Sequence, residues 1–137
     1  AGVAEGLNLG ENAKSALISR SFAEMTRYAK KFKADKNTLF GLSGLGDLIL
    51  TCSSKNSRNT QFGIKLASSK YDNFLDLLKS QEVTEGYYTV KAVYNISQKK
   101  NIDMPIMESV YNILYKQHDL KEELSNLLSR PITEEKI

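Results

Sequence analysis

Apolar side chains recur in this chain at the three- and four-residue spacing of an amphipathic helix, and this pattern constrains the fold more than any other feature. The clearest stripe consists of Ile18, Phe22, Met25, Ala29 and Phe32. No alternation of strands and helices appears along the chain, and no Gly-x-Gly-x-x-Gly motif follows a predicted strand. We therefore expect an all-α, bundle-like domain of about six to eight helices, without a nucleotide-binding sheet of its own.

The later helices are predicted from their stripes and end signals. Proline is favoured in the first turn of a helix, so Pro105 should open one. Asp119 followed by Glu122 resembles a capping box, and Pro131 should end the helix that this box begins. A polar break is expected over 35–38. Further helices are expected over 59–66, 74–78, 84–98 and 120–128.

The segment 39–52 is apolar, with three glycines and a single charge. Glycine permits close approach of two backbones, so we expect a buried and tightly packed helical stretch. A strand over 48–52 is the alternative, although the segment lacks the alternation of β-branched residues that would favour it.

Composition excludes several classes of protein. The chain has 137 residues and a formal net charge of +3, enough for one domain and too little charge to indicate nucleic-acid binding. The single Cys52 and single His118 predict neither an internal disulfide nor a zinc site. No apolar run is long enough to span a bilayer. The chain begins at Ala1 inside a small-residue stretch; we interpret this as a cut edge, with a processed or tag-cleaved start as the alternative.

Asp47 is the only charged residue of the apolar segment. A buried carboxylate there would need a cation, backbone N–H groups or a substrate hydroxyl as a partner. The local pattern favours a helix N-cap over a functional role. Thr51 lies one helical turn further on, so the two side chains could line one polar site. Alternatively, the Thr51 hydroxyl could bond back to the Asp47 carbonyl.

Ser57, Arg58 and Asn59 begin a predicted helix. A hydroxyl, a guanidinium and an amide beside free backbone N–H groups are suited to a phosphate. An ordinary N-cap with a solvated arginine is the alternative. Glu85 opens another predicted helix, where local grounds favour a simple interaction with the helix dipole.

Several motifs occur in one order along the chain. They are Gly-Leu-Gly-Asp-Leu-Ile-Leu-Thr-Cys (44–52), Ser-Arg-Asn (57–59) and Val-Thr-Glu-Gly (83–86), preceded by Ala-Gly-Val-Ala-Glu-Gly-Leu-Asn-Leu-Gly (1–10) and followed by Met-Pro-Ile (104–106). With these motifs the chain closely resembles the C-terminal, substrate-binding domain of bacterial NAD(P)-dependent glycerol-3-phosphate dehydrogenase, from Ala1 to about Leu128.

The resemblance implies roles for the residues at these motifs. Asp47 and Thr51 would belong to the catalytic cluster around the C2 oxygen of the substrate, with Asp47 also binding substrate. Ser57, Arg58 and Asn59 would bind the substrate, the last two through its phosphate.

The resemblance also implies contacts with the cofactor, NAD(P), from Arg58, Val83 and Glu85. The family's acid/base lysine lies upstream of Ala1 and is absent from this chain. No lysine of this chain matches its motif, so none is assigned; Lys14 is close in sequence but falls inside the first long helix.

On the same basis, residues 1–137 would form a helical domain of the 6-phosphogluconate dehydrogenase C-terminal type, preceded in the family by a Rossmann domain. The implied enzyme interconverts sn-glycerol 3-phosphate and dihydroxyacetone phosphate for phospholipid synthesis. It would be cytoplasmic and homodimeric, with no nucleic acid and no membrane insertion, and this chain alone would be inactive. The alternatives are a helical domain of a hydroxy acid dehydrogenase and a non-enzymatic basic helical module.

Overall fold

The computed structural model describes residues 1–68, 76–77 and 85–131, and every regular element within these ranges is a helix. The all-α prediction is therefore confirmed. Residues 76–77 are helical, and the rest of the helix predicted over 74–78 lies outside the described residues. The elements are α1 (Gly2–Gly6), α2 (Glu11–Lys31), α3 (Lys36–Phe40), the π-helix η1 (Leu42–Gly46), α4 (Asp47–Ser53), α5 (Arg58–Ser68), α7 (Glu85–Lys100), α8 (Pro105–Lys116) and α9 (Leu120–Ser129).

The predicted end signals are mostly confirmed. Pro105 opens α8, and the Asp119 side chain accepts a hydrogen bond of 2.9 Å from the Glu122 backbone N–H at the start of α9. The polar break predicted over 35–38 is wrong in part, because Asp35 caps α3 through the Asn37 N–H, also at 2.9 Å. Local hydrogen-bond chemistry sets these ends, so a single sequence is enough to place them within a residue or two.

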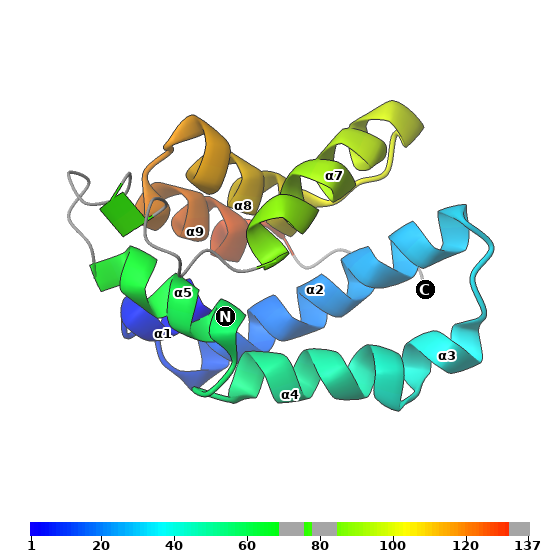
Figure 1. Cartoon of the computed structure of the whole chain (residues 1–137), viewed down its shortest axis with the longest axis horizontal. Helices are drawn as coiled ribbons and strands as arrows, with labels where there is room; N and C mark the ends of the chain where they lie inside the picture. Colours follow the sequence, from blue (N-terminus) through cyan, green and yellow to red (C-terminus); the bar gives the residue numbers. More distant parts are fainter. Residues whose placement is uncertain (69–75, 78–84, 132–137) are drawn as a thin grey trace.

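The helices form two groups on either side of α2. Figure 1 shows α3, η1 and α4 running along one side of α2, with α7, α8 and α9 on the other and α1 against α5 at one end. One buried apolar cluster joins α5 to α8, and a second joins α1, α2 and α9. The first consists of Phe62, Leu66, Ile113 and Leu114, and the second of Ala4, Leu17, Leu124 and Leu127.

Because α2 is covered on two sides, the predicted apolar stripe is not its most buried face. Phe22 is partly exposed and packs edge-on against Phe40 of α3, with ring centroids 5.1 Å apart. The stripe ends at Phe32, whose side chain is 45% exposed. The most buried residues of α2 instead include Leu17, which packs against α9, and Glu24, which bonds to α8. A helix between two layers buries polar side chains that a one-sided stripe cannot predict.

Glu24 joins α2 to the first turn of α8. Its carboxylate accepts hydrogen bonds from the backbone N–H groups of Ile106 (2.6 Å) and Met107 (3.1 Å). Pro105 has no N–H to satisfy, so the two free donors of that turn are both occupied. The side chain is only 3% exposed, and this burial raises the pKa of Glu24 to about 7 against the opposing effect of the two hydrogen bonds.

Glu24 should therefore make stability depend on pH near neutrality. Its pKa is raised on folding, so its contribution is fully present below pH 4.5 and is lost as the pH rises through about 7. We expect the free energy of unfolding of the wild type to fall by about 3 kcal/mol relative to Glu24→Gln across this window. Urea unfolding of both proteins at pH 4.5, 6 and 8 measures the difference. If the difference in free energy of unfolding between the wild type and Glu24→Gln did not change with pH, the raised pKa of Glu24 would be contradicted.

Stacked tyrosine rings hold α7 against α8. Tyr94 lies on Tyr111 with ring centroids 3.8 Å apart, and Tyr111 and Tyr87 each stack on Tyr115. The Tyr115 hydroxyl donates to the Tyr87 carbonyl at 2.7 Å. Burial raises the pKa of Tyr115 to about 12, so this hydroxyl stays protonated and remains a donor at neutral pH. These stacked tyrosines hold the first turn of α7, which begins at Glu85, against α8.

The backbones of α1 and α5 touch at two glycines. A Cβ on Gly63 would lie 2.8 Å from the Val3 nitrogen and 2.9 Å from the backbone of Gly2, while a Cβ on Gly2 would overlap the Thr60 carbonyl. Neither helix can accept a methyl group there without moving. This close approach lays α1 along α5, and Gly6 at the other end of α1 packs against Ile64 and Ala67 (Figure 1).

Gly63→Ala should destabilise the protein although alanine is the better helix former. The helix propensity gain is about 1 kcal/mol, whereas forcing two backbones apart typically costs about 1–3 kcal/mol and here the clashing atoms are not flexible. Because the clashing atoms are backbone, the cost should lie toward the upper end of this range, so we expect a net loss of about 1–2 kcal/mol in urea unfolding. Gln61→Ala, on the exposed side of the same helix, is the matched control and should change stability little. Equal stabilities for the two variants would refute the close packing.

The segment 39–52 is helical, so the strand alternative is wrong, and its predicted burial is also wrong. Leu42 is 90% exposed and Leu50 is 67% exposed, and Gly44 is the only residue of η1 and α4 that is buried. A Cβ on Gly44 would overlap the Leu39 carbonyl, so glycine does allow a close approach here. The segment packs one face on α2 and leaves the other open (Figure 1).

Candidate functional site

The N-terminus of α5 carries the three polar residues predicted to hold an anion. The Ser57 hydroxyl accepts a hydrogen bond from the Thr60 N–H (3.4 Å), and its carbonyl accepts one from the Gln61 N–H (2.9 Å), so Ser57 caps the helix. Arg58 and Asn59 are exposed, and no acidic residue lies in the first turn. The positive end of the helix dipole is thus not offset by a carboxylate, which is the electrostatic condition for holding an anion.

Asp47 is not a helix cap, contrary to the local expectation. Its backbone is helical (φ −65°, ψ −41°), because η1 runs directly into α4 at this residue. The side chain is exposed, and no hydrogen bond or ion pair involves it within the part of the chain that the structure describes. A turn of π-helix therefore ends immediately before an unpaired carboxylate, and such turns often lie at functional positions.

Thr51 is joined to the end of α5 that is predicted to bind an anion, through Thr60, for which the sequence predicts no role. Only 4% of Thr60 is exposed, and its hydroxyl donates to the Thr51 carbonyl at 2.8 Å. This bond ties the last turn of α4 to the first turn of α5. The predicted bond from the Thr51 hydroxyl back to Asp47 is not found among the described residues. A threonine in a first helical turn is a weak signal, because its partner depends on the fold.

Within the described ranges, no hydrogen bond or ion pair joins Glu85 to these residues. Glu85 is exposed at the start of α7, where its carbonyl accepts a hydrogen bond of 3.1 Å from the Thr89 hydroxyl. Val83 lies outside the described residues. The predicted cofactor contacts of these two residues remain predictions.

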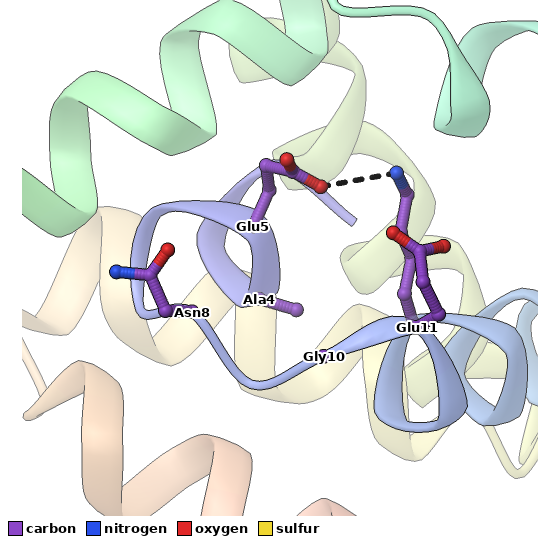
Figure 2. A pocket seen from close by; sticks show the side chains of 6 residues that line it. Ala4, Glu5, Asn8, Gly10 and Glu11 are labelled. Carbon is purple, nitrogen blue, oxygen red and sulfur yellow. Dashed lines mark hydrogen bonds and ion pairs between the residues drawn. The ribbon is translucent and has the colours of Figure 1, made fainter.

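Two lysines form ion pairs with Glu5 of α1: Lys14 from α2 and Lys55 from the loop between α4 and α5. One carboxylate oxygen of Glu5 lies 3.1 Å from the Lys14 ammonium, and the other lies 3.1 Å from the Lys55 ammonium. The dashed line in Figure 2 marks the first of these ion pairs, across a pocket between α1 and the start of α2. Hydrogen bonds from Lys14 and then Lys55 lower the pKa of Glu5.

Lys14 is buried, with only 8% of the residue exposed. The sequence predicts no role for it, because no lysine of this chain matches the motif of the family's acid/base lysine. The charge of Lys14 also acts on Cys52, the residue after Thr51. Burial raises the pKa of the Cys52 thiol, the Ala1 amino group and Lys14 oppose this rise, and Asp47 adds to it. Lys14 thus contributes to the electrostatics at the end of α4.

His118 lies elsewhere, after the end of α8, with its Nδ1 2.7 Å from the Glu123 carboxylate. Burial alone would raise the pKa of Glu123, but hydrogen bonds from Ser109, His118 and Asn112 lower it. Over the described ranges no His, Cys, Asp and Glu side chains gather as a possible metal site. None of the helices described is long and apolar enough to cross a membrane.

Most of the chain matches one known protein family. The sequence model of the family described as "NAD-dependent glycerol-3-phosphate dehydrogenase C-terminus" matches residues 1–125. The chain belongs to this family. All the predicted site residues fall within the matched region.

Individual relatives agree with the family assignment. The chain is 45% identical over 136 residues to glycerol-3-phosphate dehydrogenase [NAD(P)+] of Solidesulfovibrio magneticus, covering 98% of this chain and 41% of that protein. It is 45% identical over 135 residues to the enzyme of the same name from Ligilactobacillus salivarius, covering 98% of this chain and 39% of that protein.

A solved structure is similar as well. The crystal structure of glycerol-3-phosphate dehydrogenase from Coxiella burnetii matches with a TM-score of 0.85 and 37% identity, over 94% of this chain and 39% of that one. The chain thus spans about two fifths of the length of these family members.

Proposed function

We propose that this chain is the substrate-binding half of an NAD(P)-dependent glycerol-3-phosphate dehydrogenase, which interconverts sn-glycerol 3-phosphate and dihydroxyacetone phosphate. The observation that carries the proposal is the capped N-terminus of α5, with Arg58 and Asn59 exposed beside it and Thr60 tying it to Thr51. Membership of the family supports the same substrate class.

Ser57, Arg58 and Asn59 bind the substrate in this proposal, with Arg58 and Asn59 at the phosphate. The guanidinium supplies two parallel donors, the amide supplies a third, and the helix end adds backbone N–H groups. No carboxylate in the first turn of α5 competes for them. Binding of the phosphate fixes the distance from this end of the substrate to its C2 atom, which then lies toward α4.

Asp47 and Thr51 act at the C2 oxygen. A ketone accepts a hydride at carbon only if its oxygen is polarised and then protonated. The Thr51 hydroxyl can donate to that oxygen, and the Asp47 carboxylate can hold and orient the proton donor, which the resemblance assigns to a lysine upstream of Ala1. Asp47 has no competing partner among the described residues and is free for this role.

The cofactor, NAD(P), supplies the hydride when bound. Arg58 fits such a group because it is exposed and has no described ion-pair partner, so it can also meet a cofactor phosphate. Glu85 and Val83 would contact the cofactor from the region of α7. The exposed apolar side chains of α3, η1 and α4 would lie against the preceding Rossmann domain and exclude water from the reaction. They are Phe40, Leu42, Ile49 and Leu50.

In the same proposal the complete enzyme is a cytoplasmic homodimer that supplies glycerol phosphate for phospholipid synthesis. The second candidate is a helical domain of a related hydroxy acid dehydrogenase. The cluster of phosphate donors at the start of α5 favours a phosphorylated substrate, because an unphosphorylated hydroxy acid offers no phosphate for that helix end to bind.

The proposal is tested by following NAD(P)H oxidation with dihydroxyacetone phosphate. The complete protein should turn over, whereas the 137 residues alone should not, because in this proposal the acid/base lysine and most of the residues that bind the cofactor would belong to the preceding part of the complete protein. A complete protein that reduces an unphosphorylated 2-keto acid but not dihydroxyacetone phosphate would favour the second candidate. Turnover by the 137 residues alone would contradict the division of roles.

A further inference from the structure

Glu5 occupies a position between a buried cation and an exposed one. Lys14, whose side chain is 10% exposed, binds one oxygen of the carboxylate from α2, while Lys55, whose side chain is 74% exposed, binds the other. The buried ion pair fixes the rotamer of Glu5, because releasing it would leave Lys14 buried without a partner. The second oxygen is therefore held in place and available to Lys55.

Lys55 lies in the loop between α4 and α5, two residues before the cap Ser57. Other hydrogen bonds of this loop are local. The Asn56 N–H donates to the Ser54 hydroxyl (3.2 Å), the Ser57 N–H donates to the Ser54 carbonyl (3.2 Å), and the Thr60 hydroxyl donates to the Thr51 carbonyl beyond its ends. Lys55 makes the described side-chain bond that ties the loop to α1. Since the backbone of α1 packs directly on α5 at Gly2 and Gly63, an anchor on α1 is also fixed relative to α5.

We propose that Glu5 and Lys55 are positioning residues, which hold the loop of residues 54–57 so that Arg58 and Asn59 present their donors in one fixed arrangement. This inference rests on the proposed binding of the substrate phosphate at the start of α5. Donors held in place before binding lose less conformational freedom when the phosphate arrives, so the anchor strengthens substrate binding. Neither residue touches the substrate, and the chemical step does not depend on them.

The test is made with Lys55→Met in the complete protein. Exposed ion pairs are weak, so we expect a KM for dihydroxyacetone phosphate about two- to fivefold higher, with kcat within about twofold of wild type. Lys55→Arg keeps the ion pair and should restore the wild-type KM. Lys121→Met, an exposed lysine of α9 without a described ion pair, is the matched control and should leave the KM unchanged.

Glu5→Gln separates positioning from direct binding by Lys55. If Lys55 positions the loop, Glu5→Gln raises the KM as Lys55→Met does. The variant carrying both Glu5→Gln and Lys55→Met then has a KM no higher than that of either single variant. If Lys55 itself binds the phosphate, Glu5→Gln frees it and leaves or lowers the KM, which would overturn the inference. Because Glu5→Gln leaves Lys14 unpaired, the variant carrying both Glu5→Gln and Lys14→Met repeats the test without a buried lone charge.

A measurement without substrate distinguishes this inference from the proposed function. Amide hydrogen exchange at Asn56 and Thr60 should be about two- to fivefold faster in Lys55→Met than in Lys121→Met. Faster exchange in a protein that does not reduce dihydroxyacetone phosphate would support the anchor and reject the proposed function. Equal exchange and equal KM in the two variants would overturn the anchor and leave the proposed function standing.

Discussion

Replacing Asp47 by asparagine in the complete protein should lower kcat for dihydroxyacetone phosphate reduction by about 10²- to 10³-fold, because the proton donor that it orients typically contributes about 10²- to 10⁴-fold. Asparagine keeps the shape of the side chain but cannot hold a protonated donor by charge. The thermal midpoint should hardly change, because Asp47 is exposed and has no described partner whose bond would be lost. Steady-state kinetics and calorimetry on the same preparation measure both.

Glu108→Gln is the matched control for this prediction. It makes the same carboxylate-to-amide change at an exposed position on α8 and should leave both kcat and the thermal midpoint unchanged. If Asp47→Asn retained full kcat, Asp47 would not act at the C2 oxygen. If its thermal midpoint fell sharply instead, the carboxylate would have a structural partner that the described residues do not include.

Replacing Arg58 by alanine should raise the KM for dihydroxyacetone phosphate by about 10- to 100-fold, which corresponds to the loss of charge-assisted hydrogen bonds worth about 1.5–3 kcal/mol. Arg58→Lys should recover only part of this loss, because an ammonium cannot offer two parallel donors to a phosphate. The folded state should not suffer, since the side chain is exposed and makes no described ion pair.

Arg130→Ala serves as the control, because Arg130 is an exposed arginine that follows α9 and lies outside the proposed site. Its KM should equal that of the wild type. Competition by inorganic phosphate provides a second readout: it should inhibit the wild type and Arg130→Ala alike and inhibit Arg58→Ala less. An unchanged KM in Arg58→Ala would place the phosphate elsewhere.

Much of the secondary structure could be predicted because its determinants are local. The cap at Asp119, the proline at position 105 and the cap at Ser57 each depend on side chains within a few residues of the backbone groups that they satisfy or spare. The anion-binding chemistry of Ser57, Arg58 and Asn59 could be proposed for the same reason, since consecutive residues in one helical turn cannot be far apart.

Burial and long-range pairing could not be predicted in the same way. Leu42 and Leu50 lie in the most apolar segment and yet are exposed. Among the described helices α2 covers one face of that segment, and these two side chains lie away from it. Glu24 is buried because α2 meets the start of α8, more than 80 residues further along the chain. A single sequence records which side chains are apolar, but it does not record which element will lie against them.

The sequence by itself determined that this chain is helical, where most of its helices begin and end, and which residues could bind a phosphate. Each of these depends on neighbours along the chain, whose distances the backbone geometry fixes. The tertiary structure decided that Thr60 joins α5 to Thr51, that Glu5 joins Lys14 to Lys55, and that Asp47 is exposed and has no partner among the described residues. Those arrangements depend on how helices pack, as α1 packs on α5 at Gly2 and Gly63.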